Sequence, residues 1–113
     1  MNGVTKLSSE WHRLGPTVDF PQDEAVLVDE SPFGPLVVVF QGGKFNVLSG
    51  VCTHEDFELD GSPVQDGQLT CMLHMSSFSL TTGEALSPPA EEPLKVFESK
   101  VSEGQVYVRK MVH

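Results

Sequence analysis

Residues 52–61, CTHEDFELDG, and residues 71–74, CMLH, hold both cysteines of a 113-residue chain. Each cysteine has a histidine close behind it: His54 follows Cys52, and His74 follows Cys71. The full pattern is C-x-H, sixteen residues, then C-x-x-H, in a chain with only four histidines. Two thiols and two imidazoles at these offsets indicate one metal site that is built from two short segments.

Two kinds of metal site accept this set of four ligands. Structural zinc accepts two cysteines and two histidines in a tetrahedron, although zinc modules usually pair the cysteines with each other at short spacing. A Rieske-type cluster of two irons and two sulfides instead takes both cysteines on one iron and both histidines on the other. Two segments that each offer one cysteine and one histidine fit the second arrangement, because each segment can reach both irons.

The longer stretches CTHEDFELDG and CMLHMSSFSLTTGEALSPP resemble the two cluster-binding loops of Rieske proteins. The resemblance covers nearly the whole chain and is closest to the small ferredoxins that serve bacterial aromatic-ring-hydroxylating dioxygenases. It implies a [2Fe-2S] cluster with Cys52 and Cys71 on the buried iron, and with His54 and His74 on the outer iron through Nδ1. It also implies an electron carrier between an NAD(P)H-dependent flavoprotein reductase and the Rieske centre of a terminal oxygenase.

Four positions bear on the potential of such a cluster. The bridging cysteines of respiratory Rieske subunits are replaced here by Phe57 and Leu73, and the absence of that bridge fits a reducing cytosol. Ser76 matches a serine that hydrogen-bonds a sulfide in those subunits, whereas Phe78 matches a tyrosine and has no hydroxyl to donate. A lost donor leaves more negative charge on the sulfurs. We therefore expect a potential near the bottom of the roughly −150 to +300 mV Rieske range.

The rest of the sequence predicts an all-β fold, because its apolar runs are short, rich in β-branched residues and separated by Gly, Pro and acidic residues. Residues 36–41 and 44–48 flank Gly42-Gly43 and predict a tight hairpin. Similar runs predict strands at 11–14, 25–28, 69–73, 78–80, 94–99 and 105–110. We expect one Rieske-like antiparallel domain over residues 1–113, with a small cluster-binding lobe, about residues 46–86, inserted in a β base.

The charge is acidic and unevenly distributed. The chain has 16 Asp and Glu residues against 7 Lys and Arg, and no Lys or Arg lies between Phe45 and Leu94. The same stretch holds half of the acids: Glu55, Asp56, Glu58, Asp60, Asp66, Glu84, Glu91 and Glu92. This excludes nucleic acid and anionic membranes as expected partners, since both require clustered cations. The acidic stretch is either a solvated face or a docking surface for a basic partner.

No apolar run approaches the roughly 20 residues that span a bilayer, and the N-terminal residues do not form a secretory signal. We therefore expect a cytoplasmic protein, and we expect it to be a monomer.

No catalytic constellation is present: the sequence has no G-x-G-x-x-G and no His-His-carboxylate triad. We expect no enzymatic activity of its own. Two alternatives stay open, namely a small subunit of an assimilatory nitrite reductase and a zinc-stabilised binding module without redox activity. The first is disfavoured because all four ligands are present, whereas some of those subunits have lost them.

Overall fold

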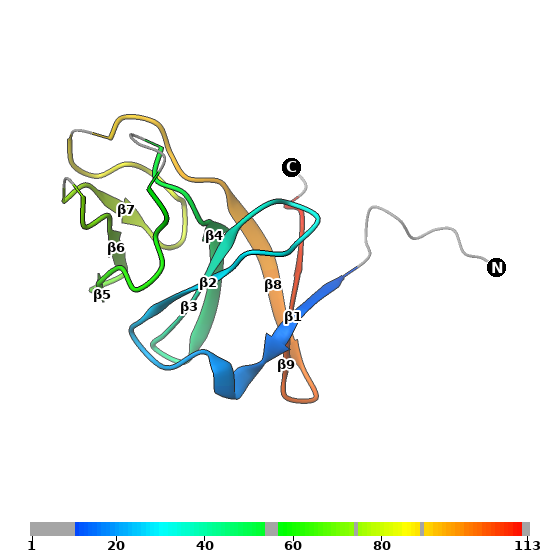
Figure 1. The fold of residues 1–113 in the computed structure, drawn as a ribbon. Helices are drawn as coiled ribbons and strands as arrows, with labels where there is room; N and C mark the ends of the chain where they lie inside the picture. Colours follow the sequence, from blue (N-terminus) through cyan, green and yellow to red (C-terminus); the bar gives the residue numbers. More distant parts are fainter. Residues whose placement is uncertain (1–10, 54–56, 74, 89, 112–113) are drawn as a thin grey trace.

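Two antiparallel sheets make up the computed structural model, which describes residues 11–53, 57–73, 75–88 and 90–111 (Figure 1). A six-stranded sheet has the order β1-β9-β8-β4-β3-β2, and a three-stranded sheet has the order β5-β6-β7. The bounds are β1 His12–Pro16, the 3-10 helix η2 Thr17–Asp19, β2 Ala25–Val28, β3 Leu36–Gln41, β4 Lys44–Ser49, β5 Val64–Gln65, β6 Gln68–Thr70, β7 Ser77–Ser79, β8 Val96–Ser102 and β9 Gln105–Arg109. The prediction of an all-β fold is confirmed.

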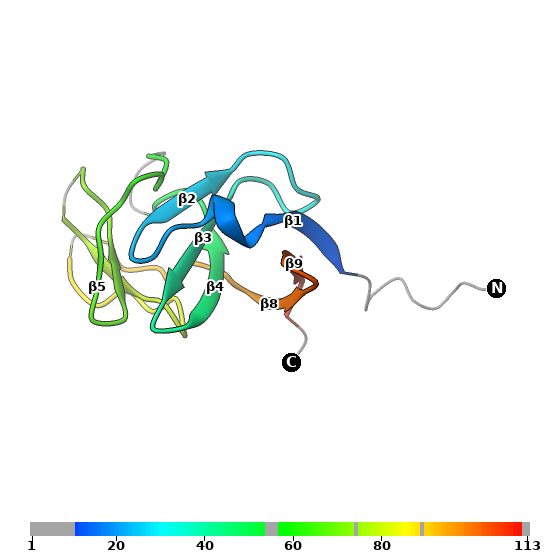
Figure 2. The ribbon, with the colours of Figure 1, turned by 90° about the horizontal axis from the view of Figure 1, so that it is seen from below.

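The small sheet belongs to a lobe, residues 50–95, that leaves the large sheet after β4 and returns to it at β8. The two ends of the lobe are joined where the backbone N–H of Ser49 donates to the carbonyl oxygen of Lys95 at 2.9 Å. Strands β4 and β8 then pair as neighbours in the large sheet. Figures 1 and 2 show the small sheet set to one side of the large one, at the end away from β1 and β9.

Strand β3 is buried on both faces, and this explains its unbroken apolar sequence. Val37 and Val39 pack into a core shared with the lobe, whereas Leu36 and Val38 pack into a second core. Because successive side chains of a strand point to opposite faces, the two sets lie on opposite sides of the sheet. The lobe therefore packs against one face of the large sheet, and its position depends on β3.

Three hairpins close through turns with two consecutive residues in the left-handed region. Their φ values are 61° and 79° at Gly42-Gly43, 53° and 75° at Glu103-Gly104, and 54° and 76° at Asp66-Gly67. Positive φ at both central residues matches the twist of the flanking strands. The expected turn at Gly42-Gly43 is confirmed. The hairpin at Asp66-Gly67 was missed, because strands of two and three residues give too short a pattern.

Several predicted boundaries are wrong. The strand expected at residues 69–73 ends at Thr70 as β6, and Cys71 begins a loop instead. The first strand runs from His12 to Pro16 rather than over 11–14. The lobe was expected to begin near residue 46, but Asn46 is paired with Val39 inside β4. The ends of a strand depend on which neighbouring strand pairs with it. An apolar run in the sequence does not reveal that partner, so it does not define the strand ends.

Candidate metal centre

The first cysteine opens a closed loop at the edge of the lobe. Cys52 donates its backbone N–H to the carbonyl oxygen of Phe57 at 2.9 Å, and Val51 forms an antiparallel bridge with Glu58. The loop over residues 52–57, called the first loop below, thus leaves and re-enters the lobe at one place. His54, the predicted ligand within this loop, lies outside the described residues.

The second cysteine opens a loop that is closed in the same way. Cys71 donates its backbone N–H to the carbonyl oxygen of Ser76 at 2.7 Å, and its own carbonyl accepts the N–H of Met75 at 2.8 Å. Met75 has a backbone φ of 62°, which residues other than glycine rarely adopt. This second loop, residues 71–76, leads from β6 to β7. Its predicted ligand His74 also lies outside the described residues.

The structure brings the two cysteines together in one buried cluster. Cys52 is 4% exposed and Cys71 is 1% exposed, and both belong to the core of the lobe together with Leu59, Leu69 and Phe78. No disulfide joins these two described cysteines. Two unoxidised, shielded thiols at the start of two matching loops suit metal binding, because a buried site protects thiolate ligands from water and oxidant. The donor set therefore fits a metal centre with two thiolate ligands.

The four residues that the sequence links to the reduction potential lie in the two loops and in β7. Phe57 packs against the lobe core, and Phe78 is fully buried there. Ser76 is fully buried, and its hydroxyl oxygen accepts the backbone N–H of Ala90 at 3.0 Å. Leu73, which stands where respiratory subunits have the other bridging cysteine, is 46% exposed. A turn at residues 72–73 directs it away from the core.

Apolar side chains of the second loop and of Leu86 are exposed to solvent. Met72 and Met75 are 48% and 64% exposed, and Leu73 lies between them in sequence. Leu86, 45% exposed, is held nearby because its N–H donates to the carbonyl oxygen of Ser77 at 2.7 Å. Exposed methionines form adaptable contact surfaces. The second loop thus presents apolar side chains to solvent.

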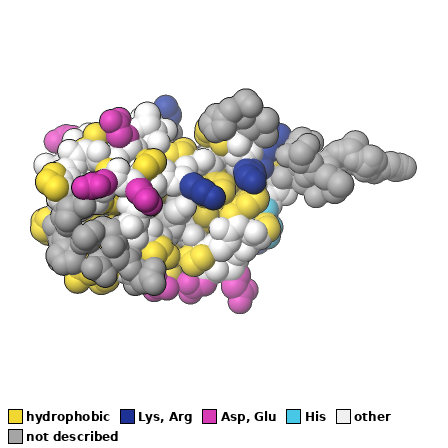
Figure 3. Space-filling view, turned by 90° about the horizontal axis from the view of Figure 1, so that it is seen from above, with side chains coloured by type: hydrophobic (Ala, Val, Ile, Leu, Met, Phe, Trp, Pro, Cys, Tyr) yellow, Lys and Arg dark blue, Asp and Glu magenta, His cyan; other side chains and the backbone are white. Residues whose placement is uncertain are grey.

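Acidic and basic side chains are unevenly distributed over the surface, as they are in the sequence. On the face in Figure 3, several Asp and Glu side chains lie over the lobe at the left and others lie along the lower edge, whereas most Lys and Arg side chains lie toward the centre and right, over the large sheet. At the far end of the large sheet, Trp11 contacts the cations of Lys100 and Arg109, with 4.7 and 4.3 Å to the ring centroid. Trp11 therefore packs within the β base.

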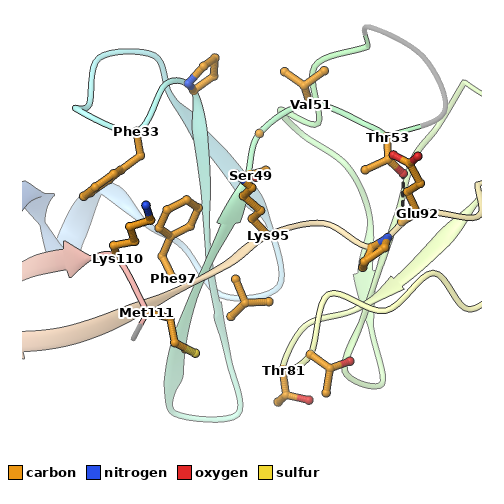
Figure 4. A pocket seen from close by; sticks show the side chains of 15 residues that line it. Phe33, Ser49, Val51, Thr53, Thr81, Glu92, Lys95, Phe97, Lys110 and Met111 are labelled. Carbon is orange, nitrogen blue, oxygen red and sulfur yellow. Dashed lines mark hydrogen bonds between the residues drawn. The ribbon is translucent and has the colours of Figure 1, made fainter. Parts of the chain in front are cut away.

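A groove of about 1040 Å³ runs between the lobe and the large sheet. Figure 4 shows Thr53 and Glu92 at its lobe end and Phe33, Lys110 and Met111 at its sheet end. The dashed line in Figure 4 is a hydrogen bond in which the Thr53 hydroxyl donates to the Glu92 carbonyl at 2.7 Å. The hydrogen-bonded pair Thr53 and Glu92 thus forms part of one wall of the groove, and Thr53 directly follows Cys52.

These features define a small all-β protein with a two-loop metal centre. A family model described as the Rieske [2Fe-2S] domain matches residues 10–98, so the chain belongs to the Rieske [2Fe-2S] domain family. The cofactor of this domain is a [2Fe-2S] cluster. The resemblance seen in the sequence is thereby confirmed.

Curated relatives of the chain are ferredoxin subunits of a dioxygenase. The chain is 35% identical over 94 residues to the 3-phenylpropionate/cinnamic acid dioxygenase ferredoxin subunit of Shigella flexneri serotype 5b (strain 8401), covering 82% of this chain and 87% of that one. The protein of the same name from Escherichia coli (strain K12) matches with the same identity and coverage.

Solved structures share the fold over most of their length. A chain of the complex of reduced oxygenase and oxidized ferredoxin in carbazole 1,9a-dioxygenase has a TM-score of 0.82 and 30% identity, covering 91% of this chain and 97% of that chain. The Sphingomonas yanoikuyae B1 ferredoxin has a TM-score of 0.83 over 90% of this chain and 100% of its own, at 24% identity, which shows the fold alone. In the described residues, no helix has the length and apolar character needed to cross a bilayer.

Proposed function

We propose that this chain is the ferredoxin of an aromatic-ring-hydroxylating dioxygenase system. It takes single electrons from an NAD(P)H-dependent flavoprotein reductase and passes them to a terminal oxygenase. The observation that carries the proposal is the pair of matching loops, each closed from its cysteine N–H to the carbonyl five residues later, in a Rieske-family chain similar to dioxygenase ferredoxins.

The proposed ligands are Cys52 and Cys71 for one iron and His54 and His74 for the other. When bound, a [2Fe-2S] cluster accepts and releases one electron at a time. The burial of both cysteine side chains supports their place at the inner iron. Two thiolates and two neutral imidazoles carry two fewer negative charges than four thiolates, so this ligand set makes an added electron easier to accept.

The chain's own side chains tune and shield the site. Ser76 accepts from Ala90 through its hydroxyl oxygen, which leaves the hydroxyl hydrogen for a further acceptor inside the lobe. Phe78 fills the core without a hydroxyl. Respiratory subunits have a serine and a tyrosine hydroxyl at these two positions, whereas this chain has only the hydroxyl of Ser76. One hydrogen-bond donor in place of two supports a reduction potential near the lower end of the Rieske range, roughly −150 mV.

We further propose a single Rieske domain over residues 1–113, a monomer, located in the cytoplasm. The family match over residues 10–98 supports the first point. The acidic lobe and the apolar residues Met72, Leu73 and Met75 supply a docking surface suited to a partner with a basic rim around an apolar centre. An interface of this kind is small, as electron-transfer encounters require.

Spectroscopy and reconstitution test the proposal together. The purified protein should be reddish-brown, should bleach with dithionite, and should contain two irons per chain. It should then pass electrons from NADH through a flavoprotein reductase to a terminal oxygenase, with the components of the 3-phenylpropionate/cinnamic acid and carbazole systems as first candidates. A colourless protein with one zinc per chain would instead establish a binding module without redox activity.

A further inference from the structure

The segment over residues 87–93, called the strap below, is fastened to both loops by side-chain hydrogen bonds. At its start, Ser87 accepts the backbone N–H of Ser77 through its hydroxyl oxygen at 2.9 Å. The N–H of Ala90 donates to the hydroxyl of Ser76 at 3.0 Å. The strap is thus bound twice at the second loop and the strand that follows it.

The same strap is bound to the first loop a few residues later. There the hydroxyl of Thr53 donates to the carbonyl oxygen of Glu92 at 2.7 Å, as drawn in Figure 4. Thr53 stands between Cys52 and His54, and Ser76 stands two residues after His74. The structure therefore links the two loops through one short piece of backbone.

The link is short enough to fix the spacing of the loops. Ala90 and Glu92 are two residues apart, so their Cα atoms are separated by at most about 7 Å even in a fully extended chain. Ala90 is 4% exposed and Ser76 is fully buried, so this end of the strap is held inside the lobe core. Two residues after the strap the chain reaches the large sheet, where the carbonyl oxygen of Lys95 accepts the N–H of Ser49.

We infer that Thr53 is a positioning residue, which holds the first loop at a fixed distance from the second through the strap. The inference rests on the proposed function, in which the two loops carry the cluster ligands. Thr53 has one hydroxyl hydrogen, and Glu92 accepts it, so this hydrogen is not available to a sulfur atom. Its effect on a bound cluster therefore arises from the position of the loop. Groups that orient metal ligands typically contribute 10–100-fold in metal affinity.

The test compares how firmly three variants hold the cluster. Thr53→Val keeps the shape of the side chain and removes the donor, whereas Thr53→Ser keeps the donor. Thr70→Val is the matched control, because Thr70 precedes Cys71 and its hydroxyl contacts Ser77 rather than the strap. Loss of the visible absorbance is followed in excess chelator, together with the line width of the electron paramagnetic resonance spectrum of the reduced protein.

Thr53→Val should lose the cluster about tenfold faster than the parent and show broadened resonance lines. Thr53→Ser and Thr70→Val should both stay within about twofold of the parent, which is well below that effect. The inference is overturned if Thr53→Val behaves like the parent, or if Thr53→Ser is as labile as Thr53→Val.

A second variant covers the case in which Thr53→Val assembles no cluster. One glycine inserted between Glu91 and Glu92 lengthens the strap and leaves every side chain of the two loops in place. It should also release the cluster faster than the parent, and equal retention would overturn the inference. A parent protein that binds no cluster at all would contradict the proposed function instead, so the two failures are distinct.

Discussion

Gly83 and Leu94 meet where the lobe turns back toward the large sheet. The N–H of Leu94 donates to the carbonyl oxygen of Gly83 at 2.8 Å, and Gly83 has a φ of 76°. A β-carbon at Gly83 would overlap the backbone carbonyl oxygen of Leu94 and press on Val96. The backbone that leads into β8 therefore passes over this glycine with no room for a side chain.

Gly83→Ala should reduce the free energy of unfolding by about 2–5 kcal/mol, the range for a strained left-handed residue combined with overpacking. Gly67→Ala is the matched control, since Gly67 has the same φ of 76° and open space around the missing β-carbon. It should show the strain alone, about 1–2 kcal/mol. Urea denaturation followed by circular dichroism measures both, and equal losses would show that the contact with Leu94 is unimportant.

Replacing either proposed ligand histidine by cysteine should lower the reduction potential, provided that the cluster still assembles. His54→Cys and His74→Cys each exchange a neutral imidazole for a thiolate. The added negative charge makes an incoming electron less favourable. A potentiometric titration of each purified variant, beside the parent, measures the shift. An unchanged or higher potential would contradict the proposed ligand set.

Added salt should slow the reduction of this protein by its reductase. The lobe carries no Lys or Arg between Phe45 and Leu94, so its acids attract a basic surface at long range. Between about 0.01 M and about 0.15 M salt the Debye length falls from about 30 to about 8 Å. Stopped-flow rates at low protein concentration should fall steadily over this range, and a flat profile would rule out steering by the lobe.

The exposed methionines of the second loop should contribute to docking. Met72→Ala combined with Met75→Ala removes apolar contact area while leaving all four proposed ligands in place. We expect the second-order rate of electron transfer to fall by about threefold to tenfold, with the potential unchanged. Val101→Ala, a similarly exposed apolar side chain on β8, serves as the control. An unaltered rate in the methionine variant would remove these residues from the docking surface.

The pair Glu98–Arg109 should add an acid-sensitive contribution to stability. Arg109 Nε donates to Glu98 Oε1 at 2.8 Å, and this hydrogen bond lowers the pKa of Glu98 below its ordinary value. A lowered folded-state pKa means that the contribution is present above the ordinary carboxyl pKa and is lost as the pH falls through the lowered value. Glu98→Gln should flatten the stability profile in that acidic window. Unfolding midpoints of the parent and of Glu98→Gln, taken between neutral and acidic pH, measure this pH dependence. Coinciding profiles for the two proteins would contradict the prediction.

The sequence predicted the large sheet well, because strands such as 36–41 and 44–48 are apolar runs joined by strong turn residues. It predicted the small sheet poorly. Strands β5 and β6 have two and three residues, and their partners rather than their composition define them. The Asp66-Gly67 pair was the available signal for that hairpin.

By itself, the sequence predicted the chemistry of the centre. Cys52, His54, Cys71 and His74 stand at offsets that few chains share, and ligand identity is a property of residue type and spacing. Only the tertiary structure decided what holds the two loops together. The bonds from Thr53 to Glu92 and from Ala90 to Ser76 join residues 39 and 14 positions apart. No local pattern encodes such contacts, since they depend on the packing of the whole lobe against the buried strand β3.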